Sequence, residues 1–406
     1  MNEIVERRLT DLLTHIVDNR GRSCPTADSG FPLIATNCVK DSELYPTFEN
    51  IRFVNEETYA TWFRSHPLPG DIVFVCKGSP GRTALVPDPV PFCIAQDMVA
   101  LRANPTVVNN RYLYYVLQCA DTRRKIENMH VGTMIPHFKK GDFNKLLLPI
   151  HSNLGNQEAI AEVLGALDNK IVANAELAKL LSDSLLAAYE YIVDTPETFV
   201  PLQELVSVTK GVSYRSADLQ GSTTALVTLK SFDRNGGYAQ RGLKDYVGPF
   251  KSAQKILPGE LVVAQTDLTQ GADVVGRVVR VPSSSNHEAL IASLDLAIVR
   301  PLGETPIEYL YGALLQRRFR EHCKAHTSGT TVLHLAKDAI ATYPAPVVPV
   351  SDQRRFANAA RPMFTLLDNT ALESQTLSVM RNALLPQLMS GRMQVKDAEK
   401  LVEAAV

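Results

Sequence analysis

The sequence predicts a duplicated chain of α/β (α+β) globules, in the order globule, long helix, globule, long helix. Two observations predict it. Residues 156–194 carry one long helical pattern, and a series of sequence landmarks recurs in the same order about 190 residues later. The expected boundaries are 1–150 for the first globule, 151–196 for the first helix, 197–347 for the second globule, and 348–406 for the second helix with a C-terminal tail. We expect a pseudo-twofold axis to relate the two copies.

The first long helix is predicted by apolar residues that alternate by four and three, which is the spacing of a coiled-coil seam. The seam residues are Ile160, Leu164, Leu167, Ile171, Asn174, Ala178, Leu181, Leu185 and Ala188. We expect Asn156 to cap the first turn and Thr195-Pro196 to end the helix. Helical residues rise ~1.5 Å each, so the rod is roughly 55 Å long and is suited to be a spacer.

A second apolar row on this helix predicts a second neighbour. Its members are Val163, Ala166, Ala173, Leu177, Leu180, Ala187 and Tyr191. We expect partner binding by Val163, Leu177, Leu180 and Tyr191. The alternative is an amphipathic helix that lies on its own domain.

The second long helix repeats the first seam. The matching residues are Gln353, Phe356, Ala360, Met363, Leu367, Leu377 and Leu384. We expect Ser351 or Asp352 to cap it, Pro362 to bend or locally break its first turns, and proline and glycine in 384–391 to stop it. The two helices should pair antiparallel, with Asn174 facing the partner helix as a polar register marker. Alternatively, Asn174 points to a trapped water.

The two globules share a framework but differ in their polar loops. In the first, strands are expected at 31–36, 70–75, 91–101 and 146–148, and a helix from 112. The second globule has counterparts at 226–228, 259–263, 291–292 and 309–311. The loops 77–82 and 265–271 have different side chains, as do 20–23 and 210–215. This pattern predicts two modules that recognise two different targets.

The composition excludes several classes of protein. The net charge of −1 over 406 residues gives no global attraction to nucleic acid or membrane. The six cysteines form no CxxC pair, which predicts reduced core thiols. No apolar run approaches the ~20 residues that cross a bilayer. These features favour a soluble, intracellular protein.

The motifs of catalysis are missing from the sequence. There is no GxxxxGK[ST] phosphate loop and no GxGxxG after a strand. His322 and His326 have a metal-like spacing, but no fourth ligand is near, so a surface histidine pair is expected and no metal site. Asp97 and Asp295 match across the repeat and are expected to make structural hydrogen bonds. We expect a non-catalytic chain.

Two stretches resemble a known family. They are residues 149–174, with the segments QEAIAEVL and LDNKI, and the tail LLPQLMSG at 384–391. The arrangement resembles the specificity (S) subunits of type I restriction-modification enzymes over essentially the whole chain. The turn at Gly70-Asp71-Ile72 and the loop at Gly132-Thr133 are similar to elements of their target-recognition domains.

The resemblance implies a DNA-reading subunit in the cytoplasm whose two target-recognition domains each bind one half of a split site. The helices would act as a ruler between them. Two methyltransferase (M) subunits, which bind S-adenosylmethionine, would dock on this chain, and motor-nuclease (R) subunits would join them. No cofactor is implied for the chain itself, and no membrane.

Donors at loop tips are the expected DNA contacts, because arginine and glutamine bond to base edges while lysines and hydroxyls mostly hold phosphates. They are Arg22, Lys77, Ser79, Arg82, Thr133, His137 and Lys139 in the first globule, and Tyr214, Arg215, Lys230, Arg234, Gln270, Thr330 and His334 in the second. Each of these residues could instead be a solvated surface residue. His137 and His334 could instead be core histidines that hold their loops in place.

Two other functions stay open. One is an enzyme with an unfamiliar site, which a pocket with convergent titrating groups would indicate. The other is a scaffold that binds only proteins, which weak specific DNA binding by the assembled complex would indicate.

Overall fold

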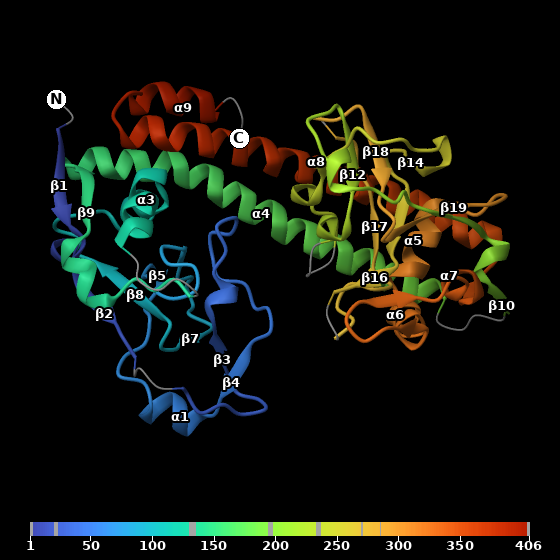
Figure 1. Ribbon diagram of the computed structural model, residues 1–406, viewed down its shortest axis with the longest axis horizontal. Coiled ribbons are helices and arrows are strands. Elements are labelled where there is room, and N and C mark those ends of the chain that lie inside the picture. The colour runs from blue at the N-terminus through green and yellow to red at the C-terminus, as the bar shows by residue number, and fades with distance from the viewer. Residues whose placement is uncertain are drawn as a thin grey trace. The chain divides into compact units, whose positions relative to one another are not determined.

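The structure is a computed structural model in which the described residues are 3–19, 23–129, 135–193, 198–232, 237–268, 271–284 and 286–403. It divides into two compact units. The first unit is Met1–Ala175 with Ala371–Val406, and the second unit is Glu176–Thr370. Each unit contains one globule and a part of both long helices (Figure 1).

The described part of the first unit contains three sheets. They are the antiparallel pair β1 (Ile4–Arg8) and β9 (Leu147–His151); the sheet β2 (Leu13–Val17), β8 (Met98–Ala103), β5 (Ile72–Val75) and β6 (Thr83–Leu85), in this order; and the sheet β4 (Arg52–Val54), β3 (Phe31–Ile34) and β7 (Cys93–Ile94). All pairings are antiparallel except that of β3 with β7.

Strand β5 is buried on both faces because different layers cover them. Phe74 belongs to a core cluster that includes Leu113 and the α4 residue Leu164. Val73, which points to the opposite face because strand side chains alternate, packs with Ile34 in another cluster. The short helices of this unit are α1 (Glu56–Thr61), α2 (Asn110–Gln118), α3 (Ala120–Met129) and the C-terminal α9 (Val395–Glu403), which is folded back alongside the end of α8 (Figure 1).

The second unit repeats this topology and adds further strands. Its sheets are β10 (Thr198–Pro201) with β22 (Pro344–Val347); β11 (Val206–Lys210), β19 (Leu296–Pro301), β15 (Leu261–Ala264) and β17 (Val278–Arg280); β13 (Lys244–Asp245), β12 (Thr224–Val227), β18 (Ala289–Ala292) and β14 (Lys255–Ile256); and β16 (Thr266–Asp267), β21 (Leu333–Leu335) and β20 (Thr327–Ser328). Its short helices are α5 (Ile307–Leu315), α6 (Arg317–Ala325) and α7 (Ala339–Thr342). The pairing of β12 with β18 is parallel, like that of β3 with β7. Strand β14 and the sheet of β16, β21 and β20 have no counterpart among the described strands of the first unit. The predicted duplication is confirmed for the shared framework of the other strands.

The long helices α4 (Leu154–Ile192) and α8 (Val350–Met389) pair antiparallel in both units. In the first unit, Asn174 Nδ2 donates to Glu373 Oε2 at 2.6 Å and to Ser374 Oγ at 3.1 Å. In the second unit, Leu185 and Tyr189 share a core cluster with Phe356. The predicted pairing is confirmed, and Asn174 faces the partner helix as expected.

The start of each long helix differs from the prediction. Asn153 caps α4, because its Oδ1 accepts a hydrogen bond from the backbone N–H of Asn156 at 3.0 Å. Helix α8 begins at Val350, so Ser351 and Asp352 lie inside its first turn. A side chain can accept from the N–H groups of the first turn only when its residue precedes that turn, so neither can be the cap.

The interior and end of the helices also correct two expectations. At the end of the α4 seam Ala188 is exposed and its neighbour Tyr189 is fully buried. Helix α8 continues through both Pro362 and Pro386. It ends at a glycine C-cap, because Gly391 has φ +69° and the next N–H donates back to Gln387 O at 3.0 Å.

One strand prediction was too long. The apolar stretch 91–101 contains two strands, β7 and β8, in two different sheets. The backbone turns between them at Ala95–Asp97, where the Met98 N–H donates to Ala95 O and the Asp97 carbonyl accepts from Cys76 N–H at 2.9 Å. The second unit has the same break between β18 and β19.

Candidate nucleic-acid interface

In the first unit, the loop that follows β5 is joined to the segment that precedes β9. Lys77 and His137 face each other in an antiparallel bridge. The Gly78 N–H donates to Pro136 O at 2.9 Å, and Phe138 N–H donates to Cys76 O at 2.8 Å. The structure therefore brings Lys77 and His137 together, with the exposed Lys139 two residues further on.

Ser79 and Arg82 lie in the turn between β5 and β6, and both are half-buried. Arg82 Nε is 4.0 Å from Asp41 Oδ2, and Arg123 Nη2 is 2.7 Å from the other oxygen of the same carboxylate. Two guanidinium groups therefore share one acid, which leaves this edge with excess positive charge. Sequence reasoning missed Arg123, although it starts the basic run Arg123–Lys125 that indicates such an edge.

The second unit contains an equivalent junction. His334 on β21 lies opposite Thr266 of β16 on one side and Ser328 of β20 on the other. The histidine is exposed, so it is not a core residue. Thr330 is exposed at the tip of the β20–β21 hairpin, where Gly329 has φ +120°. The structure thus brings Thr330 and His334 onto one hairpin.

The other predicted donors of the second unit lie around the sheet of β12. Tyr214 is half-buried against Leu226 and Tyr246. Lys244 Nζ lies 5.6 Å from the centroid of the Tyr214 ring, a cation–π contact that sequence reasoning missed. Arg215 and Lys230 are exposed, Arg215 just before a 3₁₀ turn and Lys230 just after β12. No contact joins this group to the β20–β21 hairpin among the described interactions.

Four predicted contacts lie outside the described residues. They are Arg22, Thr133, Arg234 and Gln270.

The predicted partner row on α4 is only in part available to a partner. Val163 is buried in the core of the first unit, packed with residues of the globule, so its second neighbour is the globule itself. Leu177 is half-buried, whereas Leu180 is 64% exposed and Tyr191 is 83% exposed. Of the four residues expected to bind a partner, the two that are largely exposed therefore lie in the second unit.

The histidine pair and the cysteines, the side chains with potential reactivity, have contacts typical of structural residues. His322 Nε2 lies 2.9 Å from Ala339 O, and its ring packs at 4.2 Å from that of His326. In the described ranges no three His, Cys, Asp or Glu side chains are grouped to hold a metal. Burial raises the pKa of the Cys76, Cys93 and Cys323 thiols to about 12 in each case, so they stay protonated near neutral pH. Five of the six cysteines are buried free thiols, as predicted, and Cys119 is a half-buried free thiol.

Asp295 makes the structural hydrogen bond expected of it, because its Oδ1 accepts from Thr266 Oγ1 at 2.9 Å. Within the part of the chain that the structure describes, no helix has both the length and the hydropathy of a membrane span.

Comparison with known proteins shows a family match in the first part of the chain and a similar fold over nearly all of it. Residues 3–181 match the family model of the type I restriction modification DNA specificity domain. The S subunit of a type I restriction-modification system from M. genitalium has a similar fold over 95% of this chain and 96% of its own, with a TM-score of 0.54 and 17% identity. The HsdS subunit from Thermoanaerobacter tengcongensis matches over 96% and 97%, with a TM-score of 0.36 and 17% identity. No curated protein matches the sequence significantly.

The family match covers the first globule and most of helix α4, and the fold similarity extends over nearly the whole chain. The part at 3–181 belongs to the type I restriction modification DNA specificity family. The resemblance found in the sequence agrees with this match over residues 3–181, and the chain as a whole has the fold of a type I restriction-modification S subunit.

Proposed function

We propose that each unit reads one half of a divided DNA site. The observation that carries this proposal is the duplicated framework with different donors at equivalent places: the junction after β5 presents Lys77 and His137, whereas the junction after β15 presents Thr330 and His334. Side chains of different hydrogen-bonding type recognise different base edges. One scaffold with two sets of donors therefore fits a site with two unlike halves.

The long helices set the distance between the half-sites in this proposal. Helices α4 and α8 each run without interruption from one unit into the other, and their pairing is fixed by polar contacts as well as apolar ones. Arg381 Nη1 donates to Asp168 Oδ1 at 2.6 Å, and both side chains are largely buried. Such a contact selects one register of the pair.

The chain acts in an assembly rather than alone. We infer that it binds two methyltransferase subunits, which carry S-adenosylmethionine, and that motor-nuclease subunits complete the complex in the cytoplasm. Leu180 and Tyr191, both largely exposed on α4, support docking of a protein partner. The specificity chain itself contributes recognition and no catalytic group.

Site selection with the methyltransferase complex tests the assignment of the readers. Arg82→Ala should relax base preference in one half of the selected site, and Arg215→Ala in the other half, by about 1–3 kcal/mol at the affected position. Arg317→Ala, at an arginine whose side chain is 90% exposed on α6, is the control and should leave both halves unchanged. If both loop variants select the same site as the natural chain, these arginines are not base readers.

A further inference from the structure

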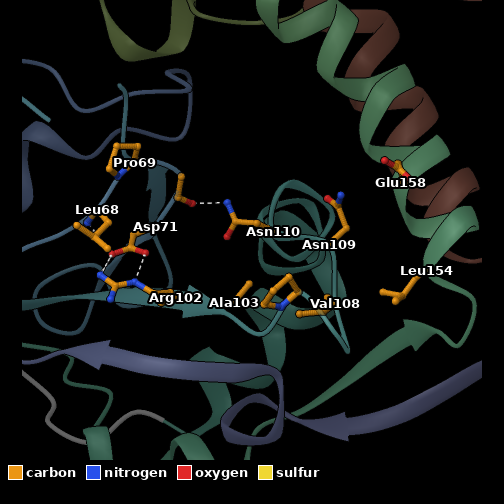
Figure 2. Close-up of a pocket in the computed structure, with 12 residues that line it drawn as sticks. Leu68, Pro69, Asp71, Arg102, Ala103, Val108, Asn109, Asn110, Leu154 and Glu158 are labelled. Carbon is orange, nitrogen blue, oxygen red and sulfur yellow. Dashed lines mark hydrogen bonds and ion pairs between the residues drawn. The ribbon is translucent and has the colours of Figure 1, made fainter. Parts of the chain in front are cut away.

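A tight turn in front of the central strand of the first unit is held by a buried carboxylate. Asp71 is 3% exposed, and its Oδ2 accepts from the Leu68 N–H at 2.8 Å. Arg102 donates to both Asp71 oxygens, at 3.0 and 2.9 Å. Gly70, with φ +82°, allows the turn. The leucine at its start is therefore held in a fixed position (Figure 2).

The second unit builds the same turn with the same bonds. Glu260 Oε2 accepts from the Leu257 N–H at 2.8 Å. Arg300 donates to the two Glu260 oxygens at 2.5 and 3.0 Å, and Gly259 has φ +88°. The two turns have the same hydrogen bonds although the side chain of Glu260 is one methylene longer than that of Asp71. We call Leu68–Asp71 and Leu257–Glu260 the leucine turns.

Both turns hold an apolar side chain in solvent. Leu68 is 50% exposed and Leu257 is 54% exposed. The first residue of each long helix is also apolar and exposed, with Leu154 at 40% and Val350 at 42%. In the first unit, Leu68 and Leu154 line one cavity of about 550 Å³, whose other residues include Val108 (Figure 2). Because these leucines are exposed, holding them in place adds little apolar burial to the core of their own unit.

The chemistry of this surface fits a protein and not DNA. Arg102 is the one cationic side chain in the lining of the cavity, and Asp71 neutralises it. Glu158, also in the lining, adds negative charge that repels phosphate. The lining is otherwise mainly apolar, as in the core of a protein interface.

We propose that the leucine turns are a duplicated docking surface, and that each receives one copy of the methyltransferase subunit. The loops proposed to read DNA differ between the units, whereas the turn, its acid–arginine pair and its exposed leucine recur in both. A surface built twice fits a partner that binds twice through one set of contacts. The inference rests on the proposed function, which requires two methyltransferase copies.

The test counts methyltransferase copies by native mass spectrometry of the complex assembled with Leu68→Asp, with Leu257→Asp and with both. A charge in the centre of an apolar contact opposes binding because it must be desolvated. Each single variant should lose one of two copies, and the double variant both. Leu401→Asp, at a leucine 49% exposed on α9, is the matched control and should keep two.

The outcomes separate this inference from the proposed function. If the natural chain holds fewer than two methyltransferase copies, the proposed stoichiometry is wrong and the docking inference is overturned with it. If the natural chain holds two and the double variant also holds two, the docking inference alone is overturned.

A second measurement does not depend on the folding of any variant. Hydrogen exchange of the natural chain should slow at 66–71 and 255–260 when the methyltransferase is added. Unchanged exchange at both segments would overturn the inference. So would self-association of the free chain that Leu68→Asp abolishes, because the turn would then join copies of this chain.

Discussion

At the level of single residues, the ion pair of Asp168 and Arg381 is a buried polar contact between the long helices. Asp168 is 2% exposed, and it also accepts a hydrogen bond from Tyr115 OH at 2.6 Å. A helix of the globule, α4 and α8 thus meet at one carboxylate. Burial raises the pKa of Tyr115, and the Asp168 charge raises it further, so the phenol remains a donor across the neutral range.

We expect Asp168→Asn to lower the free energy of unfolding by about 3 kcal/mol, because removing one charge of a buried pair leaves the other uncompensated. Urea unfolding at neutral pH measures it. The control is Asp121→Asn, since Asp121 is 74% exposed and pairs with Arg124 on the surface of α3. An exposed pair contributes at most about 1 kcal/mol. Equal losses in both variants would show that Asp168 has no special role.

Lys77 provides a second prediction for a single residue. Its side chain is exposed at the junction with His137, where a phosphate contact is expected. Lys77→Ala should weaken binding to all DNA sequences alike and reduce the slope of log affinity against log salt by about 1. Lys396→Ala, at an exposed lysine of α9, is the control. A variant with an unchanged slope would exclude the phosphate contact.

Some residues could be predicted from the sequence, and others could not. Asn174 stood out because it is polar in an apolar seam, and it indeed binds the other helix. Tyr189 did not stand out, because the heptad pattern places Ala188 in the seam. The structure buries Tyr189 against Gly312, where an added Cβ would collide with its ring. That choice depends on a residue far along the chain, which periodicity does not contain.

Among the helices and strands, the end of α8 gives a sharp prediction. Gly391 has φ +69°, and a Cβ there would meet only ordinary contacts with His151 and Ile4. Gly391→Ala should therefore cost about 1 kcal/mol of unfolding free energy through backbone strain alone. Gly141→Ala, where φ is not positive and no atom lies within 4 Å of the new Cβ, should cost much less. A similar loss at both glycines would remove the C-cap argument.

The strands that were predicted well are those with a local signal for their start. A glycine and an acid precede both β5 and β15, and an apolar run follows. The stretch 91–101 had no such signal at its break, because the turn at Ala95–Asp97 is fixed by a backbone bond to Cys76 from another strand. Pro362 was expected to interrupt α8, yet its neighbours Ala360 and Phe364 are buried against the partner helix. Tertiary packing outweighs the local preference.

For the molecule as a whole, the duplication was predictable because both copies keep their framework residues in order. The recognition surface was less predictable from the sequence. Side chains such as Tyr214 and His334 were found by type and loop position, but the structure places them in separate groups of the second unit. Which donors act together depends on strand pairing in three dimensions, and one sequence does not show it.

The ruler hypothesis predicts the effect of changing helix length. One helical turn is ~5.4 Å and one base-pair step ~3.4 Å, so four residues inserted near Ala173, with a matching insertion near Asn369, should change the gap between half-sites by roughly one or two base pairs. Four residues are close to a full turn and preserve the seam best. Bending of DNA can absorb a part of the change at a cost of a few kcal/mol.

The half-site sequences themselves should not change in the insertion variant. Methylation assays on duplexes that differ only in gap length measure the preference. An insertion variant that assembles and still methylates only the original gap would point to the methyltransferase partners as the element that sets the distance.

Selection of binding sites from randomised duplex DNA by the assembled methyltransferase complex tests the central claim most directly. The account predicts two short, unlike sequence elements separated by a gap of fixed length and free sequence, with the elements assigned to the two units by the Arg82→Ala and Arg215→Ala variants. A single uninterrupted element, or the absence of any sequence preference in a complex that contains all its subunits, would contradict it.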